Sequence, residues 1–487
     1  MGNVSKKEYS PLQKERSKYQ PKLPDLLASL GESCFEIIPG KGPKEALRAL
    51  FQKTFNSSMY RLKKGKGKKG TLRIGVFFSG GQASGGHNVI AGLFDAGATL
   101  IGFLNGPDGL IKNKFIEVKE IDSVRNQGGF DLLGSGRTKI ETQEQMAASL
   151  KACEHHRLDG LCVIGGDDSN TNAAYLAEYF LEKGCKTKVV GVPKTIDGDL
   201  RSNEIEMTFG FDSATKTYSE IIGNIARDAL SAKKYYHFIK LMGRSASHIT
   251  LECALKTGPN LALISEERKS LAQIVSELAD LIILRHSKGK EYGVILIPEG
   301  LVEFVPEFQE LGEGSEKDPH GNIELSKIKT EELLLDRIKQ ELERRQFGGK
   351  FNALTHFLGY EGRSCMPSNF DADYAYALGK LAYLAVREEL TGVICAIQNL
   401  REKANHWEMK MVPIVQLMHF ELRSGKQKPV IQKFLVDLNS KTFLHFSELR
   451  TGWTVEDRYM YPGPIQFFGN SDLTDSRPLS LKGSSYD

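Results

Sequence analysis

From residue 71 onward, short apolar runs alternate with longer amphipathic stretches. The run at 72–78 contains one charged residue, Arg73, and is typical of a buried strand. Strands that alternate with helices are typical of a parallel sheet covered by helices, so we expect an α/β protein. Further strands are predicted at 99–104, 160–164, 188–192, 237–241, 260–264 and 292–297, with helices such as 172–181 and 247–255 between them.

Two stretches depart from this alternation. Residues 1–70 are polar and irregular, and they end in a run rich in lysine and glycine at 61–70. We expect a solvated, mobile segment there; a polyanion-binding tail is the alternative, disfavoured because no aromatic residue interrupts the run. Residues 303–347 are acidic and polar and include a charged helical pattern at 329–345. This pattern predicts an inserted surface element outside the domain cores.

Length and composition narrow the class of protein. A chain of 487 residues with 40% hydrophobic residues is long enough for two domains or more. Lys and Arg number 65 and Asp and Glu 61, so the net charge of +4 favours neither nucleic acid nor membrane as a partner. The N-terminal residues lack the apolar region of a secretion signal, and no apolar run is long enough to span a membrane. Seven cysteines without a CxxC pair indicate a reducing, cytoplasmic environment.

Glycines and acidic residues gather where three predicted strands end. A loop with four glycines follows the first strand at 79–88, Gly-Gly-Asp-Asp occupies 165–168, and Pro-Lys-Thr-Ile-Asp-Gly-Asp occupies 193–199. Ligands of parallel sheets bind beyond the carboxyl ends of the strands. Phosphoryl transfer needs carboxylates for Mg²⁺, close backbone approach to phosphate, a cation and a base. The three turns supply all four, so they predict one phosphoryl-transfer site.

The glycine loop is the weakest of the three signals. Its backbone N–H groups could face an anion at the start of a helix. It is not a Walker A motif, because no Gly-Lys-Ser/Thr follows the glycines. A simple tight turn is the alternative, and the position after the first strand favours a phosphate loop.

The first acidic turn places Asp167 and Asp168 before a helix that we expect Ser169 or Asn170 to cap. Acidic residues in a first helical turn can also serve only the helix dipole. The two preceding glycines favour approach of a ligand, because glycine weakens the end of a strand without local benefit. We predict that this turn binds Mg²⁺ and phosphate.

The second acidic turn presents Lys194, Thr195, Asp197 and Asp199 together. A carboxylate that follows an apolar strand and lies near other acids is partly desolvated, and its pKa rises toward the range of a general base. A surface turn could present the same residues by chance, and the preceding strand disfavours that alternative.

Four further clusters combine glycine with arginine, glutamate or tyrosine after strand-like runs. Arginine suits bidentate recognition of phosphate, and glutamate suits sugar hydroxyls. Any one cluster could be an ordinary salt-bridge site, but four of them bordered by glycine favour a common site. They are Gly134-Ser135-Gly136-Arg137, Met242-Gly243-Arg244, Pro298-Glu299-Gly300 and Gly359-Tyr360-Glu361-Gly362-Arg363.

Together these motifs resemble those of the phosphofructokinase family, from about residue 51 to beyond residue 407. The resemblance is greatest to the catalytic, beta-like chain of its long, plant-type, pyrophosphate-dependent branch. It implies two Rossmann-like parallel-sheet domains with an N-terminal extension and a helical insertion. The implied divisions are an extension at 1–70, a pyrophosphate- and Mg²⁺-binding domain at 71–208 and 362–414, and a fructose 6-phosphate-binding domain at 209–361 and 415–487.

In this resemblance, two residues of the acidic turns determine whether the phosphoryl donor is ATP or pyrophosphate. ATP-using relatives have glycine where this chain has Asp168, and an acid there obstructs the α-phosphate of a nucleotide. They also have glycine at the position of Lys194, where pyrophosphate users place a lysine that stabilises the leaving phosphate. Both features occur together here, so the resemblance implies pyrophosphate as the donor.

The resemblance also implies roles for the other site residues. Asp197 would accept the proton of the C1 hydroxyl of fructose 6-phosphate, with Thr195, Ile196 and Asp199 beside it. Gly80 and Gly81 would bind pyrophosphate, Asp167 would bind Mg²⁺, and Arg137 would contact both substrates. The sugar would be bound by Met242, Gly243, Arg244 and Glu299, and its 6-phosphate by Tyr360 and Arg363. Lys234 and Tyr235 would contribute to the site of a partner copy across a dimer interface.

Two positions depart from the family pattern. Ser84 stands where the family loop usually has proline, so we expect a slightly looser phosphate loop. Leu354 stands where short ATP-dependent relatives have a phosphate-binding arginine, and plant-type relatives share this loss. Part of the contact with the 6-phosphate must then come from elsewhere.

The implied reaction is reversible, Mg²⁺-dependent phosphorylation of fructose 6-phosphate by pyrophosphate, which serves glycolysis or gluconeogenesis. The implied partners are the two substrates and further copies of the chain in a homodimer or larger homo-oligomer, with a heteromer containing a regulatory chain as a second arrangement. An ATP-dependent phosphofructokinase is the nearest alternative. A non-catalytic regulatory subunit is a second alternative, and it is disfavoured because such a chain would lack the residues of the acidic turns. A related kinase that acts on NAD or lipid is a third alternative, and it is disfavoured because the clusters at 242–244, 298–300 and 359–363 suit a sugar phosphate.

Overall fold

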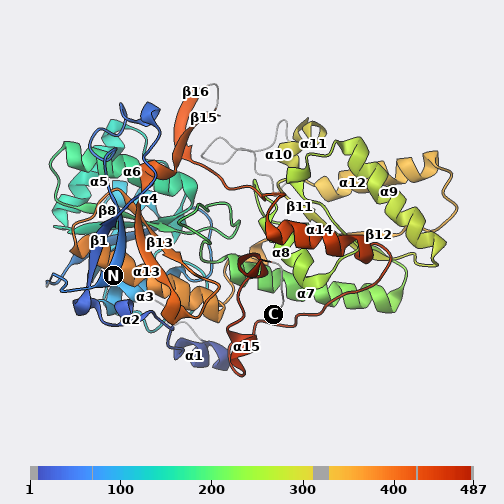
Figure 1. Ribbon diagram of the computed structural model, residues 1–487, viewed down its shortest axis with the longest axis horizontal. Helices are drawn as coiled ribbons and strands as arrows, with labels where there is room; N and C mark the ends of the chain where they lie inside the picture. The colour runs from blue at the N-terminus through green and yellow to red at the C-terminus, as the bar shows by residue number, and fades with distance from the viewer. Residues whose placement is uncertain (1–8, 69, 311–327, 424–425, 484–487) are drawn as a thin grey trace.

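The structure is a computed structural model that describes residues 9–68, 70–310, 328–423 and 426–483. Two bodies lie side by side, each built around one sheet with helices on its faces (Figure 1). We call the body with the larger sheet the first body and the other the second body. The predicted α/β class is confirmed.

The first body has a ten-stranded mixed sheet in the order β1-β2-β14-β13-β8-β7-β3-β4-β5, with β6 beside β3. Its central strands β13, β8, β7, β3 and β4 are parallel, whereas β1, β2, β14 and β5 pair in antiparallel fashion. The strands are β1 Ser33–Ile38, β2 Met59–Lys64, β3 Arg73–Ser79, β4 Thr99–Phe103, β5 Phe115–Val118, β6 Ser135–Gly136, β7 Gly160–Gly165, β8 Lys188–Pro193, β13 Val393–Gln398 and β14 Glu408–Pro413.

Side chains of the central strands alternate between two apolar layers. Ile74 and Phe78 of β3 pack with α3 and α13 on one face, whereas Phe77 packs with α5 and α6 on the other. Both faces of a parallel sheet are buried, which explains the continuous apolar runs in the sequence. The helices of this body are α3 Gly86–Asp95, α4 Pro107–Ile111, α5 Gln143–His155, α6 Asp167–Glu182 and α13 Asn369–Arg387.

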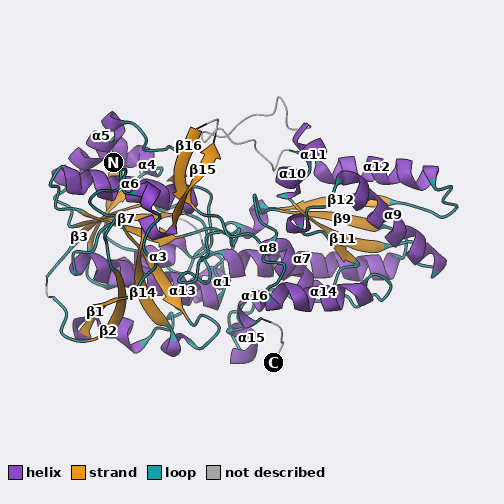
Figure 2. Ribbon diagram, turned by 45° about the horizontal axis from the view of Figure 1, so that its top comes forward, coloured by secondary structure: helices purple, strands orange, loops and turns teal. Residues whose placement is uncertain are grey.

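The second body has a four-stranded parallel sheet in the order β10-β11-β9-β12. Helices α7 and α8 contact it from one side, and α9 and α12 form the opposite layer (Figure 2). The elements are β9 Tyr236–Leu241, β10 Leu261–Ala262, β11 Gly293–Pro298, β12 Ala353–Leu358, α7 Phe211–Ala232, α8 His248–Thr257, α9 Leu271–Ser287, α10 Leu301–Phe304, α11 Pro306–Glu310, α12 Thr330–Arg344 and α14 Lys441–Trp453.

The helix predicted at 329–345 exists as α12, but the prediction that it belongs to a surface element is wrong. Leu334, Ile338 and Leu342 are buried and pack with Phe238 of β9 in the core of the second body. Their spacing of four residues forms an apolar stripe. The charged residues between them hid this stripe in the sequence. Residues 311–327 of the predicted insertion lie outside the described residues.

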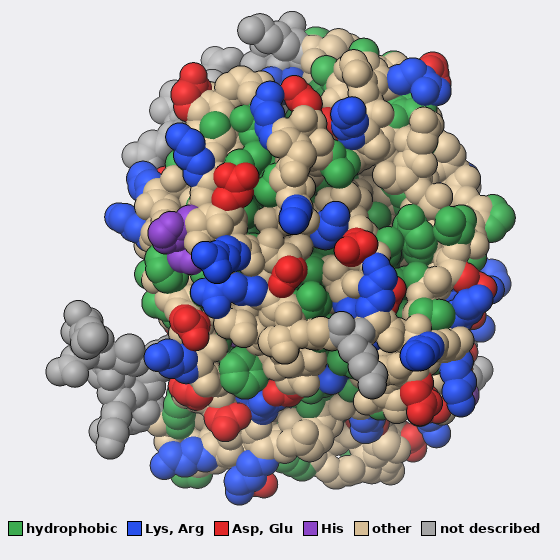
Figure 3. Space-filling view, turned by 90° about the vertical axis from the view of Figure 1, so that its left-hand side faces the viewer, with side chains coloured by type: hydrophobic (Ala, Val, Ile, Leu, Met, Phe, Trp, Pro, Cys, Tyr) green, Lys and Arg blue, Asp and Glu red, His purple; other side chains and the backbone are tan. Residues whose placement is uncertain are grey.

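The prediction of an irregular, mobile segment at 1–70 is also wrong for its described part. β2 pairs with β14 and β1 with β2, so the extension lengthens the first sheet by two strands. Leu62 alternates with charged neighbours and is buried, which is the period of a half-buried strand. Arg61 and Lys63 pair with Glu36 at 2.7 and 3.1 Å. The pairing of both side chains with Glu36 partly neutralises this basic run, which does not favour the polyanion-binding alternative. Basic and acidic side chains are interspersed on the face of the molecule shown in Figure 3.

The C-terminal quarter of the chain contacts both bodies. The hairpin of β15 (Met418–Arg423) and β16 (Lys426–Ile431) packs against α6 of the first body, whereas α14 packs against α8 of the second (Figure 1). The segment between β16 and α14 therefore crosses from one body to the other. The remaining helices are α1 Pro11–Ser17, α2 Asp25–Ala28, α15 Ser471–Thr474 and α16 Leu479–Lys482. The division into a pyrophosphate domain and a sugar domain stays a prediction.

No helix within the described ranges is long and apolar enough to cross a membrane. All seven cysteines are free thiols, and four of them are buried.

Candidate active site

The three turns predicted to form a site follow adjacent strands of the first sheet. β7 lies between β3 and β8, and the three strands are parallel. Ile164 of β7 is in register with Phe78 of β3 and Val192 of β8. The carboxyl ends of the strands therefore meet at one edge of the sheet, and the turns that follow them lie together as the sequence predicts.

The glycine loop leaves β3 through backbone conformations that favour glycine. Gly80 has φ of +87°, its N–H donates to the carbonyl oxygen of Gly136 at 2.9 Å, and its own carbonyl accepts from the Ser135 hydroxyl at 2.6 Å. Ser84 is buried, and its hydroxyl donates to the carbonyl oxygen of Cys365 at 2.5 Å. Proline has no hydroxyl for this bond, so serine ties the loop to the segment after β12 and does not loosen it.

Lys194 reaches from the second acidic turn into the glycine loop. Its side chain is 4% exposed, and Nζ donates to the carbonyl oxygen of Gly81 at 2.7 Å. A Cβ atom added to Gly80 would lie 3.3 Å from Nζ, so glycine leaves room for the ammonium. Burial lowers the pKa of Lys194 to about 8, and the guanidinium of Arg363 adds to the effect.

The first acidic turn differs from the prediction in its cap. α6 begins at Asp167 after Gly166, so the helix starts before Ser169 and Asn170, and neither caps it. Ser169 donates to the Ser79 hydroxyl at 2.8 Å, and the amide of Asn170 donates to the carbonyl oxygen of Gly165 at 2.7 Å. Asp167 and Asp168 consequently occupy the first turn, where the helix dipole favours acidic residues.

The raised pKa predicted for the second acidic turn occurs at Asp199. Burial raises the pKa of this carboxyl to about 8, and the nearby charges of Asp197 and Asp167 contribute to the rise. The backbone N–H of Asp197 donates to Thr195 Oγ1 at 3.1 Å, which orders the turn. Ile196 is buried beneath it. The carboxylates of both acidic turns are thus close enough to interact.

These carboxylates suit a magnesium ion that arrives with a phosphate ligand. Within the described part of the chain, no three acidic, histidine or cysteine side chains are placed to hold a metal by themselves. Mg²⁺ commonly binds to one or two carboxylates together with waters and phosphate oxygens. Asp167, whose Oδ2 atom is buried, interacts electrostatically with Asp199 and offers such a carboxylate.

The second body contributes the opposite wall. Gly243 follows β9, and its N–H donates to Glu299 Oε2, which follows β11, at 3.1 Å. Glu299 is 4% exposed, and burial, with a contribution from Asp197, raises its pKa to about 7. A Cβ atom at Gly300 would lie 3.0 Å from the carbonyl oxygen of Arg244, so glycine allows the two turns to approach closely. Met242, Gly243, Arg244 and Glu299 thus share one edge of the second sheet, as predicted.

Arg363 links the two bodies. It ends the 3-10 helix Tyr360–Gly362, lies 5.3 Å from the Tyr360 ring and donates to the side chain of Gln82 in the glycine loop. A Cβ atom added to Gly81 would lie 2.7 Å from Arg363 Nη2. Burial lowers the pKa of Arg363, and Arg137 lowers it further, so the two arginines also lie near each other.

The profile of the family described as Phosphofructokinase matches residues 73–386. The chain belongs to the phosphofructokinase family. It is 44% identical to the pyrophosphate–fructose 6-phosphate 1-phosphotransferase of Treponema pallidum, over 97% of this chain and 96% of that one. It is 45% identical to subunit beta 1 of the Arabidopsis thaliana enzyme of the same name, over 84% and 82% of the two chains. The family prediction is confirmed.

The fold is also that of solved phosphofructokinase structures. The structure of the pyrophosphate-dependent phosphofructokinase from Nitrosospira multiformis matches with a TM-score of 0.59 and 17% identity, and the match covers 80% of this chain and 93% of that one. At this identity the likeness shows the fold alone. It confirms the predicted phosphofructokinase fold.

Lys234 and Tyr235 lie away from the other predicted site residues. They precede β9, whereas Met242 follows it, so the six residues of β9, roughly 20 Å of extended chain, separate them. Lys234 is exposed and its Nζ lies 5.0 Å from the centre of the Tyr235 ring. The structure does not bring these residues to the site of their own chain. Their contribution across a dimer interface stays a prediction.

Three residues that the sequence reasoning missed also reach this phosphofructokinase site. Lys433 Nζ donates to the Ser245 hydroxyl at 2.5 Å, and that hydroxyl donates to Glu303 Oε1 at 3.2 Å. Ser245 directly follows Met242-Gly243-Arg244, which is a signal that could have identified it. Glu303 was part of the predicted surface element, and no glycine or aspartate lies within three residues of Lys433.

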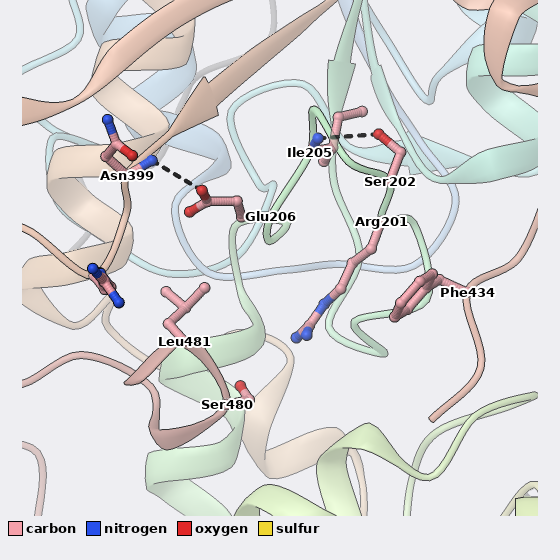
Figure 4. Close-up of a pocket in the computed structure, with 9 residues that line it drawn as sticks. Arg201, Ser202, Ile205, Glu206, Asn399, Phe434, Ser480 and Leu481 are labelled. Atoms are coloured by element: carbon pink, nitrogen blue, oxygen red, sulfur yellow. Dashed lines mark hydrogen bonds between the residues drawn. The ribbon is translucent and has the colours of Figure 1, made fainter. Parts of the chain in front are cut away.

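A cavity of about 430 Å³ adjoins the segment that follows the second acidic turn, and Figure 4 shows the residues that line it. The Arg201 side chain points into it, two residues after Asp199, and burial lowers the pKa of Arg201 to about 10. On the other side, Glu206 accepts from the backbone N–H of Asn399 at 3.0 Å. The lining residues are Arg201, Ser202, Ile205, Glu206, Asn399, Arg401, Phe434, Ser480 and Leu481.

Proposed function

We propose that this protein catalyses the reversible, Mg²⁺-dependent transfer of a phosphoryl group from pyrophosphate to the C1 hydroxyl of fructose 6-phosphate, which gives fructose 1,6-bisphosphate and phosphate. The observation that carries the proposal is the buried ammonium of Lys194, hydrogen-bonded to the glycine loop, with Asp168 in the first turn of α6. The names of relatives at 44% and 45% identity support the same reaction.

Lys194 and the glycine loop would bind pyrophosphate. Backbone N–H groups of a loop that precedes a helix suit phosphate oxygens, and α3 begins directly after Gly85. The buried ammonium would stabilise the negative charge that develops on the departing phosphate, because electrostatic interactions are stronger where water is excluded. Mg²⁺, when bound, would neutralise further charge on pyrophosphate, and Asp167 is the residue that would hold it.

Asp197 would take the proton from the C1 hydroxyl. It lies in the turn that also holds Lys194 and Asp199, and it is close enough to influence the pKa of Glu299 on the second body. A base in this position serves a sugar bound against the second body while pyrophosphate lies against the first. Arg137 would contact both substrates, because it lies near Arg363 where the bodies meet.

The sugar would bind between Met242-Gly243-Arg244 and Glu299, with Tyr360 and Arg363 on its 6-phosphate. Glu299 already accepts from the N–H of Gly243, so its second oxygen could accept from a sugar hydroxyl. Tyr360 is 63% exposed, which leaves its hydroxyl accessible to a ligand. Leu354 lies on edge strand β12, is 42% exposed and has no group that binds phosphate, so Tyr360, Arg363 and a partner copy would bind the 6-phosphate in its place.

Within the family, we assign the protein to the plant-type branch, as a catalytic, beta-like chain. We also assign it to a homodimer or a larger homo-oligomer. The match to a plant subunit named beta 1 supports the branch, and the position of Lys234 and Tyr235 far from their own site supports a shared one. The free cysteines favour a cytoplasmic location.

A donor-swap assay on the purified full chain tests the proposal. We expect turnover of fructose 6-phosphate with pyrophosphate and Mg²⁺, and little with ATP. Equal or faster turnover with ATP would overturn the choice of donor. Activity that appears only after a second type of chain is added would instead identify this chain as a regulatory subunit.

A further inference from the structure

The segment 431–436, which we call the strap, runs from the last residue of β16 toward α14 and is hydrogen-bonded to both bodies. On the first body, the N–H of Ile431 donates to Thr171 Oγ1 at 3.2 Å. In the acidic turn, the carbonyl oxygen of Asp199 accepts from the N–H of Phe434 at 2.7 Å. On the second body, the N–H of Val436 donates to Glu266 Oε1 at 2.9 Å. The strap therefore crosses the site where the two sheets face each other.

Lys433 lies in the middle of the strap and directs its ammonium into the site. Nζ donates to Ser245, which in turn donates to Glu303, so the lysine is bonded to the second body. Burial alone would lower the pKa of Lys433, but the carboxylates of Asp167, Asp199 and Glu303 outweigh it and raise the pKa. Carboxylates of both bodies therefore surround this ammonium.

We propose that Lys433 is a positioning residue of the transfer site, which holds the acidic turns of the first body and the Ser245 turn of the second at a fixed separation. This inference rests on the proposed function and deepens it. Asp167 and Asp199 cannot both be ionised in this buried site without mutual repulsion, which contributes to the raised pKa of Asp199. The ammonium of Lys433, hydrogen-bonded to the opposite wall, offsets the negative charge that the two carboxyls carry. Substrates bound to different bodies react only when they are held at the right distance, and a misplacement of about 1 Å costs on the order of 100-fold in rate.

The side chain of Lys433 is separable from the docking of the strap. The bonds of Ile431, Phe434 and Val436 are made by backbone N–H groups. His248 Nε2 also lies 2.9 Å from the carbonyl oxygen of Phe434. These backbone contacts do not depend on which side chain stands at position 433, so the strap stays docked when the lysine is replaced.

The test compares K433M, K433R and K428M with the wild-type full chain. Methionine keeps the length and apolar stem of lysine and removes its charge, whereas arginine keeps the charge. K428M is the matched control, because Lys428 lies on β16 of the same hairpin and is half-exposed beside Glu141. The measurements are kcat and KM for both substrates, the thermal midpoint, and the rise of that midpoint with magnesium pyrophosphate.

We expect K433M to lower kcat by on the order of 100-fold and to reduce the rise in thermal midpoint with magnesium pyrophosphate. The midpoint of K433M without ligand should fall below that of K428M, because the buried carboxylates lose their cation, and should stay above the assay temperature. We expect K433R to recover a substantial part of kcat, and K428M to match the wild type. A K433M enzyme whose kcat is within about threefold of wild type, or one whose loss of kcat equals the fraction of enzyme unfolded at the assay temperature, would overturn the role of Lys433 and leave the proposed function standing. A wild-type chain that neither turns over nor responds to magnesium pyrophosphate would overturn the proposed function, and this inference with it.

Discussion

The ammonium of Lys194 donates a hydrogen bond of 2.7 Å to the carbonyl oxygen of Gly81. Lys194 follows β8 and Gly81 lies just beyond β3, and β7 separates these two strands in the sheet. The bond therefore spans the edge on which all three predicted turns lie. It aims a buried positive charge at the loop predicted to hold phosphate.

Replacement of this lysine tests its role. We expect Lys194→Met to lower kcat/KM for pyrophosphate by about 10²- to 10³-fold, as when one preorganised group is removed from a charged transition state. The thermal midpoint should not fall, because the change removes a charge that burial disfavours. Lys188→Met, at the start of β8, is the matched control and should keep full activity. Equal losses of kcat/KM in Lys194→Met and Lys188→Met would count against the role of Lys194 in stabilising the departing phosphate.

The pKa of Lys194 predicts an alkaline limit on pyrophosphate turnover. Burial lowers this pKa to about 8, so the ammonium is charged below that pH and loses its proton above it. The rate with pyrophosphate should therefore decline as the pH rises through about 8. The measurement is kcat/KM for pyrophosphate over roughly two pH units on either side of that pKa. The residual rate of Lys194→Met should show no such decline, and a decline of equal size in that variant would assign it to another group.

Replacement of Asp168 should change the preferred phosphoryl donor. Asp168 occupies the first turn of α6 beside Asp167. The resemblance to the family implies that ATP users have glycine at this position. We expect Asp168→Gly to raise turnover with ATP relative to pyrophosphate, at a stability cost of about 1 kcal/mol from the weakened helix-dipole interaction and the added glycine. Asp108→Gly makes the same change in the first turn of α4 and should leave the donor ratio unaltered. An unchanged ratio in Asp168→Gly would refute the steric explanation.

The two aspartates of the second acidic turn should respond differently to amide substitution. Asp197→Asn should lower kcat by about 10²- to 10⁴-fold with little change in KM for fructose 6-phosphate, because it removes the proposed base and keeps the shape. Asp199 has a pKa raised to about 8 by burial, so near pH 6 it already carries a proton and Asp199→Asn should be milder. The comparison is a kcat and KM series at pH 6. A larger loss of kcat in Asp199→Asn would transfer the role of base to that residue.

The sequence identified those parts of the site whose residues lie next to their own strand ends. Lys194 and Glu299 directly follow a strand, and Asp167 comes two residues after one. The parallel arrangement of the strands then brings these residues to common edges. The pattern of apolar runs was sufficient for this, because glycine and acidic residues have few other reasons to follow a buried strand.

The parts that could not be predicted depend on contacts between distant segments. Lys433 enters the site because a hairpin and a strap cross from α6 to the second body, and no local pattern encodes that crossing. The strand at 59–64 was hidden by Arg61, Lys63 and Lys64, which are exposed, and the strand at 33–38 was hidden by the polar segments on either side of it. In each case tertiary pairing decided the structure where local composition pointed elsewhere.

The docked N-terminal extension predicts an unusual dependence of stability on pH. Asp373 of α13 is buried, and its Oδ1 atom accepts from the Tyr19 hydroxyl at 2.8 Å and from the Lys22 N–H at 2.9 Å. Burial raises its pKa to about 7. The folded state therefore retains a proton that the unfolded chain releases near pH 4, so this group lowers the free energy of unfolding as the pH rises from about 4 to about 7.

Replacement of Asp373 by asparagine should remove this dependence. Asparagine retains the Oδ1 acceptor for both bonds from the extension and carries no charge at any pH. The free energy of unfolding of Asp373→Asn relative to wild type should thus increase between pH 5 and pH 8, on the order of a few kcal/mol. Denaturant unfolding at several pH values measures it, with Asp472→Asn at the exposed start of α15 as the control. A constant difference across this range would mean that Asp373 is already ionised in the folded protein, and that burial by the N-terminal extension leaves its pKa near that of the unfolded chain.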